Sequence, residues 1–282
     1  MDAMPISNTI GPYMRKAHDI ADWKASLAGR IAFVTGALAV VGTVVPPDYS
    51  TAAFVLSMVL VLGVISERVL FHWYRQQHAI AESIRRRFHL AEGLLGEVPE
   101  SYLAWLRKKY GNLPADSDLY YDSDCSVGAR RLVENTLESA FWTEHLHDLE
   151  SRRYLVLSLV FLVTFLIALI TLVRFVAPPG QLPVGNVVLA VLSSSYAYGL
   201  WSKWWDYRRT HLDAEKVYDR CLSVLKTAEL NDSDTFGVFS DYSAVTLSAI
   251  PINRNTYQKH RNLLNEEWAN VKLELNRYGC RL

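Results

Sequence analysis

The sequence has no excess of charge of either sign and few cysteines. Its 29 lysines and arginines equal its 29 aspartates and glutamates, so no basic balance favours a nucleic acid polymer as partner. The three cysteines, Cys125, Cys221 and Cys280, are odd in number and widely spaced, which excludes a disulfide-rich framework and a CxxC zinc site. If they face the cytosol, we expect them to be reduced thiols.

Signatures of catalysis are absent as well. The chain contains no GxGxxG, GxxxxGK[ST], GxSxG or HExxH motif. His145 and His147 are two residues apart, so a helix directs them away from each other and they cannot share a metal. The segment DSDLYYDSD lacks the glycine and the final glutamate of a calcium-binding EF-hand loop. We therefore expect neither enzyme activity nor a resident metal or cofactor.

What the sequence does have is long apolar runs. A membrane span needs about 20 mostly apolar residues, because the hydrocarbon core is about 30 Å thick. Four stretches approach this requirement: Leu27–Val45, Ala52–Leu70, Tyr154–Ala177 and Pro183–Trp201. The third has no polar face, which argues against a buried helix of a soluble protein. The sequence thus predicts four transmembrane helices.

The same Pro-Pro break follows the first and third apolar runs. Proline ends a helix because it lacks an N–H group and clashes with the preceding turn, so each break predicts the tip of a hairpin. The tips Pro46–Ala52 and Pro178–Pro183 contain no lysine or arginine, whereas Met1–Arg30, Phe71–Arg153 and Ser202–Leu282 contain 4, 11 and 12. By the positive-inside rule, both termini and the middle segment are cytoplasmic and both tips point outward.

The predicted fold is therefore an all-α membrane protein with two transmembrane hairpins and a cytoplasmic helical domain. Its segments are a cytoplasmic N-terminal segment (1–26), hairpin 1 (27–70), a cytoplasmic helical segment (71–153), hairpin 2 (154–201) and a cytoplasmic helical C-terminal segment (202–282). Long stretches without glycine or proline predict that the spans continue as helices into the cytosol: Val64–Glu92, Ala129–Ala177 and Leu200–Phe236.

Apolar spacing indicates which faces of these helices are buried. Ile80, Ile84, Phe88 and Leu95 form one helical stripe. A C-terminal amphipathic helix is predicted from Leu263, Leu264, Trp268, Val271 and Leu275. Between these helices, Gly96–Gly128 and Leu230–Thr256 concentrate acidic, aromatic and turn residues, and we expect them to be less regular.

Five cytoplasmic arginines are the candidate ligand-binding residues: Arg85, Arg86, Arg87, Arg130 and Arg131. Near a membrane surface they are consistent with anchoring to anionic lipid, at about 1 kcal/mol per residue. Alternatively, some of them, with nearby tyrosines, clamp the phosphates of a cytoplasmic nucleotide signal. The sequence leaves both readings open.

The fourth apolar run is the most polar of the four. Asn186, Ser193, Ser194 and Ser195 would be poor lipid-facing residues and can line a water path in an oligomer. The alternative is close helix packing, because Ser195 and Gly199 form a small-x3-small pair. Gly36 ends a similar series in the first run, Ala28-x3-Ala32-x3-Gly36, so it is a packing candidate too.

A family resemblance rests on the stretch before the third run, ENTLESAFWTEHLHDLESRRY (Glu134–Tyr154). It contains an aromatic pair, Phe141-Trp142, followed by a basic pair, Arg152-Arg153. With the two-hairpin layout, it resembles the bacterial SMODS-associating four-transmembrane effector family of CBASS-type anti-phage systems. The resemblance implies a homo-oligomeric, pore-forming effector of the bacterial inner membrane that acts in abortive infection. The implied ligand is a cyclic oligonucleotide second messenger made by a partner nucleotidyltransferase. A non-conducting membrane-anchored sensor or scaffold, and a small ion channel, remain the alternatives.

Overall fold

The computed structural model describes the backbone of residues 6–42, 50–95, 97–114, 121, 123–171, 184–227 and 230–275. Within these ranges, the side chains of residues 6–8, 50, 52–53, 169 and 184–198 are not described. Both predicted Pro-Pro tips therefore lie outside the described residues.

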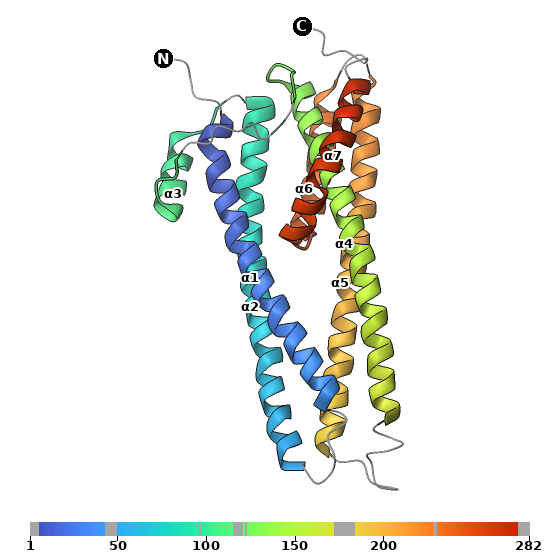
Figure 1. Cartoon of the computed structure of the whole chain (residues 1–282). Coiled ribbons are helices and arrows are strands. Elements are labelled where there is room, and N and C mark those ends of the chain that lie inside the picture. The colour runs from blue at the N-terminus through green and yellow to red at the C-terminus, as the bar shows by residue number, and fades with distance from the viewer. Residues whose placement is uncertain are drawn as a thin grey trace. The chain divides into compact units, whose positions relative to one another are not determined.

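Every regular element in the described ranges is a helix. In chain order they are α1 (Ile6–Gly42), α2 (Ser50–Leu90) with a π-helical turn (Ala91–Leu95), α3 (Glu100–Tyr110), α4 (Ala129–Thr171), α5 (Val184–Leu225), α6 (Asp232–Ser248) and α7 (Arg254–Leu275) (Figure 1). No strand occurs among these residues. The predicted all-α class is confirmed.

The chain divides into two compact units. The first, here called the helical unit, comprises Met1–Ala21, Gln76–Leu149 and Tyr207–Leu282. The second, the apolar unit, comprises Asp22–Arg75 and Glu150–Asp206. Helices α1, α2, α4 and α5 each contribute residues to both units. The predicted segment boundaries at 26, 70, 153 and 201 concern entry into a bilayer, and they stay predictions.

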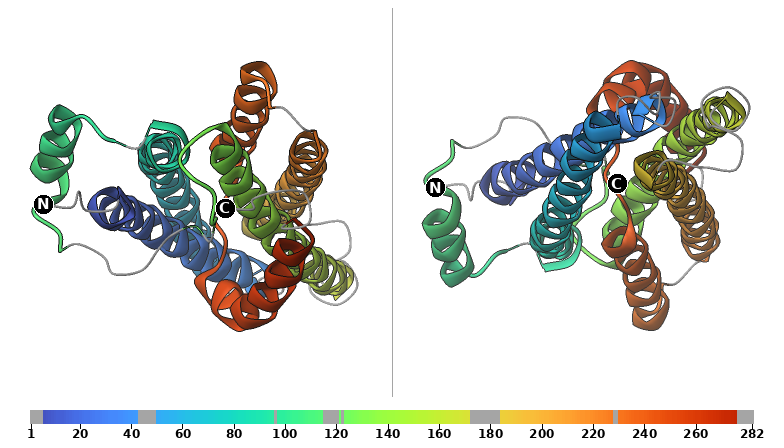
Figure 2. Two further views of the ribbon diagram at one scale, coloured as in Figure 1. Left: turned by 90° about the horizontal axis from the view of Figure 1, so that it is seen from above. Right: turned by 90° about the horizontal axis from the view of Figure 1, so that it is seen from below.

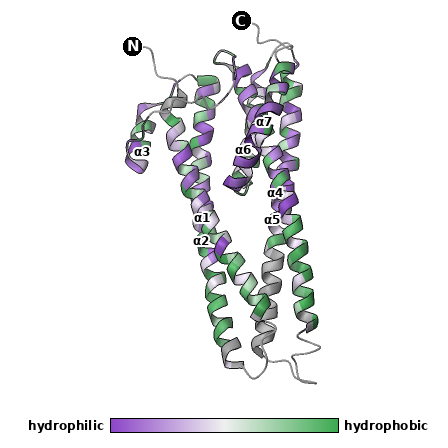
Figure 3. Ribbon diagram, in the orientation of Figure 1, coloured by the Kyte–Doolittle hydropathy of each residue, from purple (hydrophilic) through white to green (hydrophobic). Residues whose placement is uncertain are grey.

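Among the described residues, three helices are long and apolar enough to cross a membrane: Thr9–Gly42, Phe54–Leu95 and Ala129–Ala168. Their apolar side chains in the apolar unit are largely exposed. On α4, for example, Val156, Val160, Ile167 and Ile170 are each at least 59% exposed. Figure 3 shows this half of α2 and α4 as hydrophobic and the other half as mixed. So much exposed apolar surface indicates membrane association, since water disfavours it. The fourth predicted span lies mostly among side chains that are not described.

Helices α1 and α2 approach each other closely inside the apolar unit. A Cβ atom added to Gly63 of α2 would lie 2.5 Å from Oγ1 of Thr35 on α1. Thr35 and its neighbour Gly36 are buried. This is the small-residue packing that membrane helices use in place of a hydrophobic driving force. Around Gly199 of α5, by contrast, no described atom lies within 4 Å of an added Cβ.

The larger hydrophobic core of the helical unit joins the α4 and α5 segments of that unit to α6 and α7 (Figure 2). Phe141 of α4 lies with its ring centre 5.4 Å from that of Trp268 on α7. The predicted amphipathic C-terminal helix is confirmed, with Leu264, Trp268 and Leu275 buried, whereas Leu263 is exposed. The buried stripe of α7 is therefore narrower than predicted.

A second core in the helical unit joins α1, α2 and α3. Ile10 and Met14 of α1 pack with Ile84 and Phe88 of α2, and Leu106 of α3 completes the cluster. The predicted α2 stripe is thus correct at Ile84 and Phe88. It is wrong at Leu95, which is exposed because the π-helical turn ends there and the helical spacing no longer holds.

Three predictions of where helices begin and end are wrong. The predicted helix Leu200–Phe236 stops when α5 ends at Leu225. The segment Leu230–Thr256, expected to be less regular, contains the 17-residue helix α6. The Asn231 side chain accepts a hydrogen bond from the Asp234 amide at 2.7 Å, and it thereby caps the start of α6. Two acidic residues of this segment lie in the first turn of α6, and one of its aromatic residues, Tyr242, lies on the buried face of that helix. The other segment expected to be less regular, Gly96–Gly128, contains the helix α3.

One described cysteine differs from the expectation of reduced thiols, and one agrees with it. Cys125 is disulfide-bonded. The prediction rested on a cytosolic location, where thiols stay reduced. Cys221 is a free cysteine. Burial raises the pKa of its thiol to about 12.

Candidate functional site

A row of polar side chains follows one face of α2 into the interior of the helical unit. His78, Glu82, Arg85 and His89 are spaced by four, three and four residues, which places them on one side of a helix. Glu82, Arg85 and His89 are buried and His78 is half-buried. We call these four residues the polar row. Buried polar groups are stable only when they are hydrogen-bonded or paired, so each of their contacts matters.

Arg85 lies at the centre of the row with all its described contacts inside the protein. Its Nη2 lies 2.8 Å from Oε2 of Glu82, and its Nε donates to the same oxygen at 2.9 Å. Nη2 also donates to Oγ1 of Thr246 on α6 at 2.6 Å. The guanidinium carbon lies 4.7 Å from the centre of the Tyr242 ring. Arg85 therefore joins α2 to α6.

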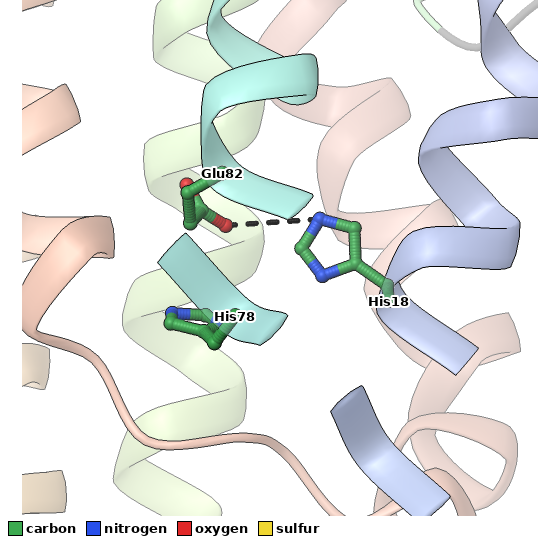
Figure 4. Close-up of side chains that lie close together, drawn as sticks. All are labelled: His18, His78 and Glu82. Atoms are coloured by element: carbon green, nitrogen blue, oxygen red, sulfur yellow. Dashed lines mark ion pairs between the residues drawn. The ribbon is translucent and has the colours of Figure 1, made fainter. Parts of the chain in front are cut away.

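At the other end of the row, three side chains converge (Figure 4). His18 of α1 points toward His78 and Glu82, which lie one turn apart on α2. Nε2 of His18 is 3.7 Å from Oε1 of Glu82. One potential ligand atom from each of the three residues can be chosen so that all lie within 4.8 Å of one another. We call this group the His-His-Glu cluster.

Burial and charge set the ionisation of this cluster. Burial lowers the pKa of His18 despite the neighbouring Glu82 carboxylate, so its imidazole is neutral near pH 7. Burial alone would raise the pKa of Glu82, but the positive charge of Arg85, joined by that of His18 once acid protonates the imidazole, lowers it to about 2. Glu82 is therefore an ionised carboxylate beside a neutral imidazole.

The five sequence-predicted arginines lie in different surroundings. Arg85 is buried as described, and Arg86 donates from Nη2 to the Ser243 carbonyl oxygen at 3.3 Å. Arg87 is exposed, with its guanidinium carbon 4.4 Å from the centre of the Tyr102 ring. Arg130 pairs with Glu134, and Arg131 pairs with Glu92 at 2.5 Å. The structure thus does not gather the five into one cluster, and their role in ligand binding stays a prediction.

The predicted pore or packing residues are only partly described. Asn186, Ser193, Ser194 and Ser195 fall within α5, but their side chains are not described. Gly36 is buried in the apolar unit, and its role in packing or in a pore stays a prediction.

The sequence analysis missed the His-His-Glu cluster. One signal was present, because His78 and Glu82 are four residues apart on a predicted helix and so share a face. The third member, His18, is 60 residues away on α1, and no local pattern connects it to the other two. Only the packing of α1 against α2 brings it close.

Comparison with family models, with curated proteins and with solved structures finds no match to this chain. The resemblance to four-transmembrane effectors therefore rests on the residues quoted above. The features that bear on function are the exposed apolar surface of the apolar unit and the polar groups buried inside the helical unit.

Proposed function

We propose that this protein is an inner-membrane effector that permeabilises or depolarises a bacterial membrane in response to a cytoplasmic signal. On this proposal the chain crosses the membrane four times, as two hairpins, with both termini and the helical unit in the cytoplasm. The protein catalyses no reaction. Subunits associate when the signal binds, and the apolar helices then open or disrupt the bilayer as part of an anti-phage defence.

One observation carries the proposal. Helices α1, α2 and α4 are long and apolar enough to span a membrane, and each also supplies core residues to the helical unit. Because each of these helices continues from the helical unit into the apolar unit without a loop, a shift of its position in one unit also moves its part in the other. A change in the helical unit is thus expected to reach the spans directly. A membrane anchor alone would not need three such continuous helices.

The signal must bind the associated state more tightly than the resting state, because a ligand shifts an equilibrium only by that difference. A nucleotide with several phosphates suits the arginines of the helical unit. Arg87 supports this choice, since its exposed guanidinium stacks on Tyr102 and keeps its N–H edge for a phosphate.

The orientation makes a prediction at the hairpin tips. In Asp48→Cys and Gln181→Cys variants, the new thiol is expected to react with a membrane-impermeant maleimide in intact spheroplasts, because each tip lies outside the cell. The label is measured by a mass shift, with the parent protein as control for its own cysteines. Protection in intact spheroplasts followed by labelling after lysis would place the tips inside.

Permeabilisation makes a second prediction. Full-length protein in liposomes is expected to release a trapped ion only when a cyclic di- or trinucleotide from a tested panel is added. Gly36→Leu is expected to reduce the release several-fold, because Gly36 is buried in the apolar unit. Gly29→Leu is the matched control, since no described atom lies within 4 Å of an added Cβ at Gly29.

The alternatives give different results in the same liposomes. A small ion channel conducts without any nucleotide. A non-conducting sensor or scaffold releases no ions under any condition and is recovered from cells with a stable partner. Either result would replace the effector proposal.

A further inference from the structure

The His-His-Glu cluster has the donor set of a transition-metal site. It offers two imidazole nitrogens and one carboxylate oxygen, and these atoms lie within 4.8 Å of one another. Two histidines and one carboxylate are the protein ligands of many zinc sites that keep a further position for water. From this geometry we propose that His18, His78 and Glu82 bind one divalent transition-metal ion, with Zn²⁺ as its representative.

Groups around the cluster already hold two of the ligands in suitable states. Nε2 of His78 lies 3.1 Å from the carbonyl oxygen of Thr246, and a carbonyl only accepts, so Nε2 carries the proton. In this tautomer Nδ1 is the ring nitrogen without a proton, and on this proposal it is the atom that ligates the ion. Such a hydrogen bond from the second ring nitrogen to a carbonyl is the usual support of a metal-binding histidine.

Glu82 is oriented in a comparable way. Arg85 contacts its Oε2, while Oε1 is the oxygen that faces His18. The carboxylate is thus fixed by one oxygen and presents the other to the cluster. Hydrogen-bonded carboxylates of this kind are typical of metal ligands.

The surroundings also allow an ion to enter. The side chain of His18 is 29% exposed, whereas that of Glu82 is 5% exposed. Water can therefore reach the cluster from the His18 side and complete the coordination. An ion bound here would link α1 to α2 within the helical unit and would stabilise that unit by mass action.

The test uses the full-length protein in detergent after treatment with a chelator. Titration with Zn²⁺, followed by calorimetry and by metal content, is expected to show one high-affinity ion per chain. The thermal midpoint is expected to rise with Zn²⁺ concentration and to fall back on addition of EDTA. Co²⁺ is expected to give the visible absorption of a site with mixed nitrogen and oxygen ligands.

Variants locate the ion. His18→Gln and Glu82→Gln are each expected to weaken Zn²⁺ binding by at least about 100-fold, because losing a direct ligand exceeds the effect of losing a supporting group. His145→Gln, a half-buried histidine of α4 in the same unit, is the control and is expected to bind as the parent does. Circular dichroism checks that each variant is folded. If Glu82→Gln does not fold, the loss of Zn²⁺ binding in His18→Gln locates the ion, because the His18 side chain is partly exposed and its replacement is easier to accommodate.

Two outcomes would overturn the proposal. In the first, the parent protein binds no Zn²⁺, and the cluster is only a contact between the Glu82 carboxylate and the neutral His18 imidazole. In the second, folded His18→Gln binds Zn²⁺ as tightly as the parent, and the ion lies elsewhere. Neither outcome affects the effector proposal, which the liposome experiment tests independently.

Discussion

Replacing Arg85 with methionine is expected to lower the free energy of unfolding of the metal-free protein by about 3–5 kcal/mol. The side chains of Arg85 and Glu82 are 7% and 5% exposed, so the variant leaves a carboxylate inside the protein without its partner. Thr246 also loses the hydrogen bond from the guanidinium. Urea unfolding in detergent, followed by circular dichroism, measures the change.

The effect of Arg85→Met is expected to depend on pH. In the parent, the charge of Arg85, joined by that of His18 once acid protonates the imidazole, holds the pKa of Glu82 at about 2 against the effect of burial. The stabilisation from this lowered pKa is present above about pH 4.5 and is lost as the pH falls toward 2. In the variant, burial acts without Arg85 and raises the pKa, so mild acid neutralises the carboxylate. The deficit relative to the parent should therefore shrink as the pH falls from 7 to 5.

Arg107→Met is the matched control for this prediction. Arg107 and Glu100 also form a close ion pair, at 2.6 Å, but their side chains are 47% and 72% exposed. Surface pairs contribute about 0–1 kcal/mol. The double variant Arg85→Met/Glu82→Leu, which removes both buried charges, should be more stable than Arg85→Met alone. If Arg85→Met and Arg107→Met lowered the free energy of unfolding equally, burial of the Arg85–Glu82 pair would not be the cause of the destabilisation.

The apolar runs of this chain predicted the helices and their exposed apolar surface well, because both depend on residues close together in the sequence. A helix without a polar face, as in Tyr154–Ala177, has few environments other than lipid, and the structure shows its described part as helical and largely exposed. Helical spacing also identified Ile84, Phe88 and Trp268 as buried residues. Each of these conclusions depends on neighbours within a few turns.

The polar interior could not be predicted in the same way. The spacing of His78, Glu82 and Arg85 is as typical of a solvated face as of a buried one. The packing of α1 and α6 onto α2 determines that this face is buried. The contacts concerned join residues that are 64 positions apart (His18 and Glu82) and 161 positions apart (Arg85 and Thr246). The sequence likewise predicted one basic patch at Arg85–Arg87, because it does not show which side of α2 is covered. In the structure Arg85 is buried and Arg87, on another side of the helix, is exposed.

Replacing Gly93 with valine is expected to destabilise the helical unit by about 3 kcal/mol or more, toward the upper end of overpacking effects. Gly93 lies in the π-helical turn after α2, and an added Cβ would lie 2.8 Å from Cα of Leu132. That neighbour is backbone, so rotation of a side chain cannot relieve the overlap. The start of α4 would have to move, and the Gly128 amide would lose its 2.8 Å hydrogen bond to the Gly93 carbonyl.

Gly93→Ala separates this overlap from helix propensity. An exposed helical glycine gains about 0.5–1 kcal/mol on replacement by alanine. Gly29→Ala, with no described atom within 4 Å of its Cβ, is expected to show that gain. Gly93→Ala should instead lose about 1–3 kcal/mol, since the cost of the overlap exceeds the gain. Hydrogen exchange should then be faster at the Leu132 amide, which bonds to the Gly128 carbonyl. A Gly93→Ala variant as stable as Gly29→Ala would mean that α4 does not pack this closely on the turn after α2.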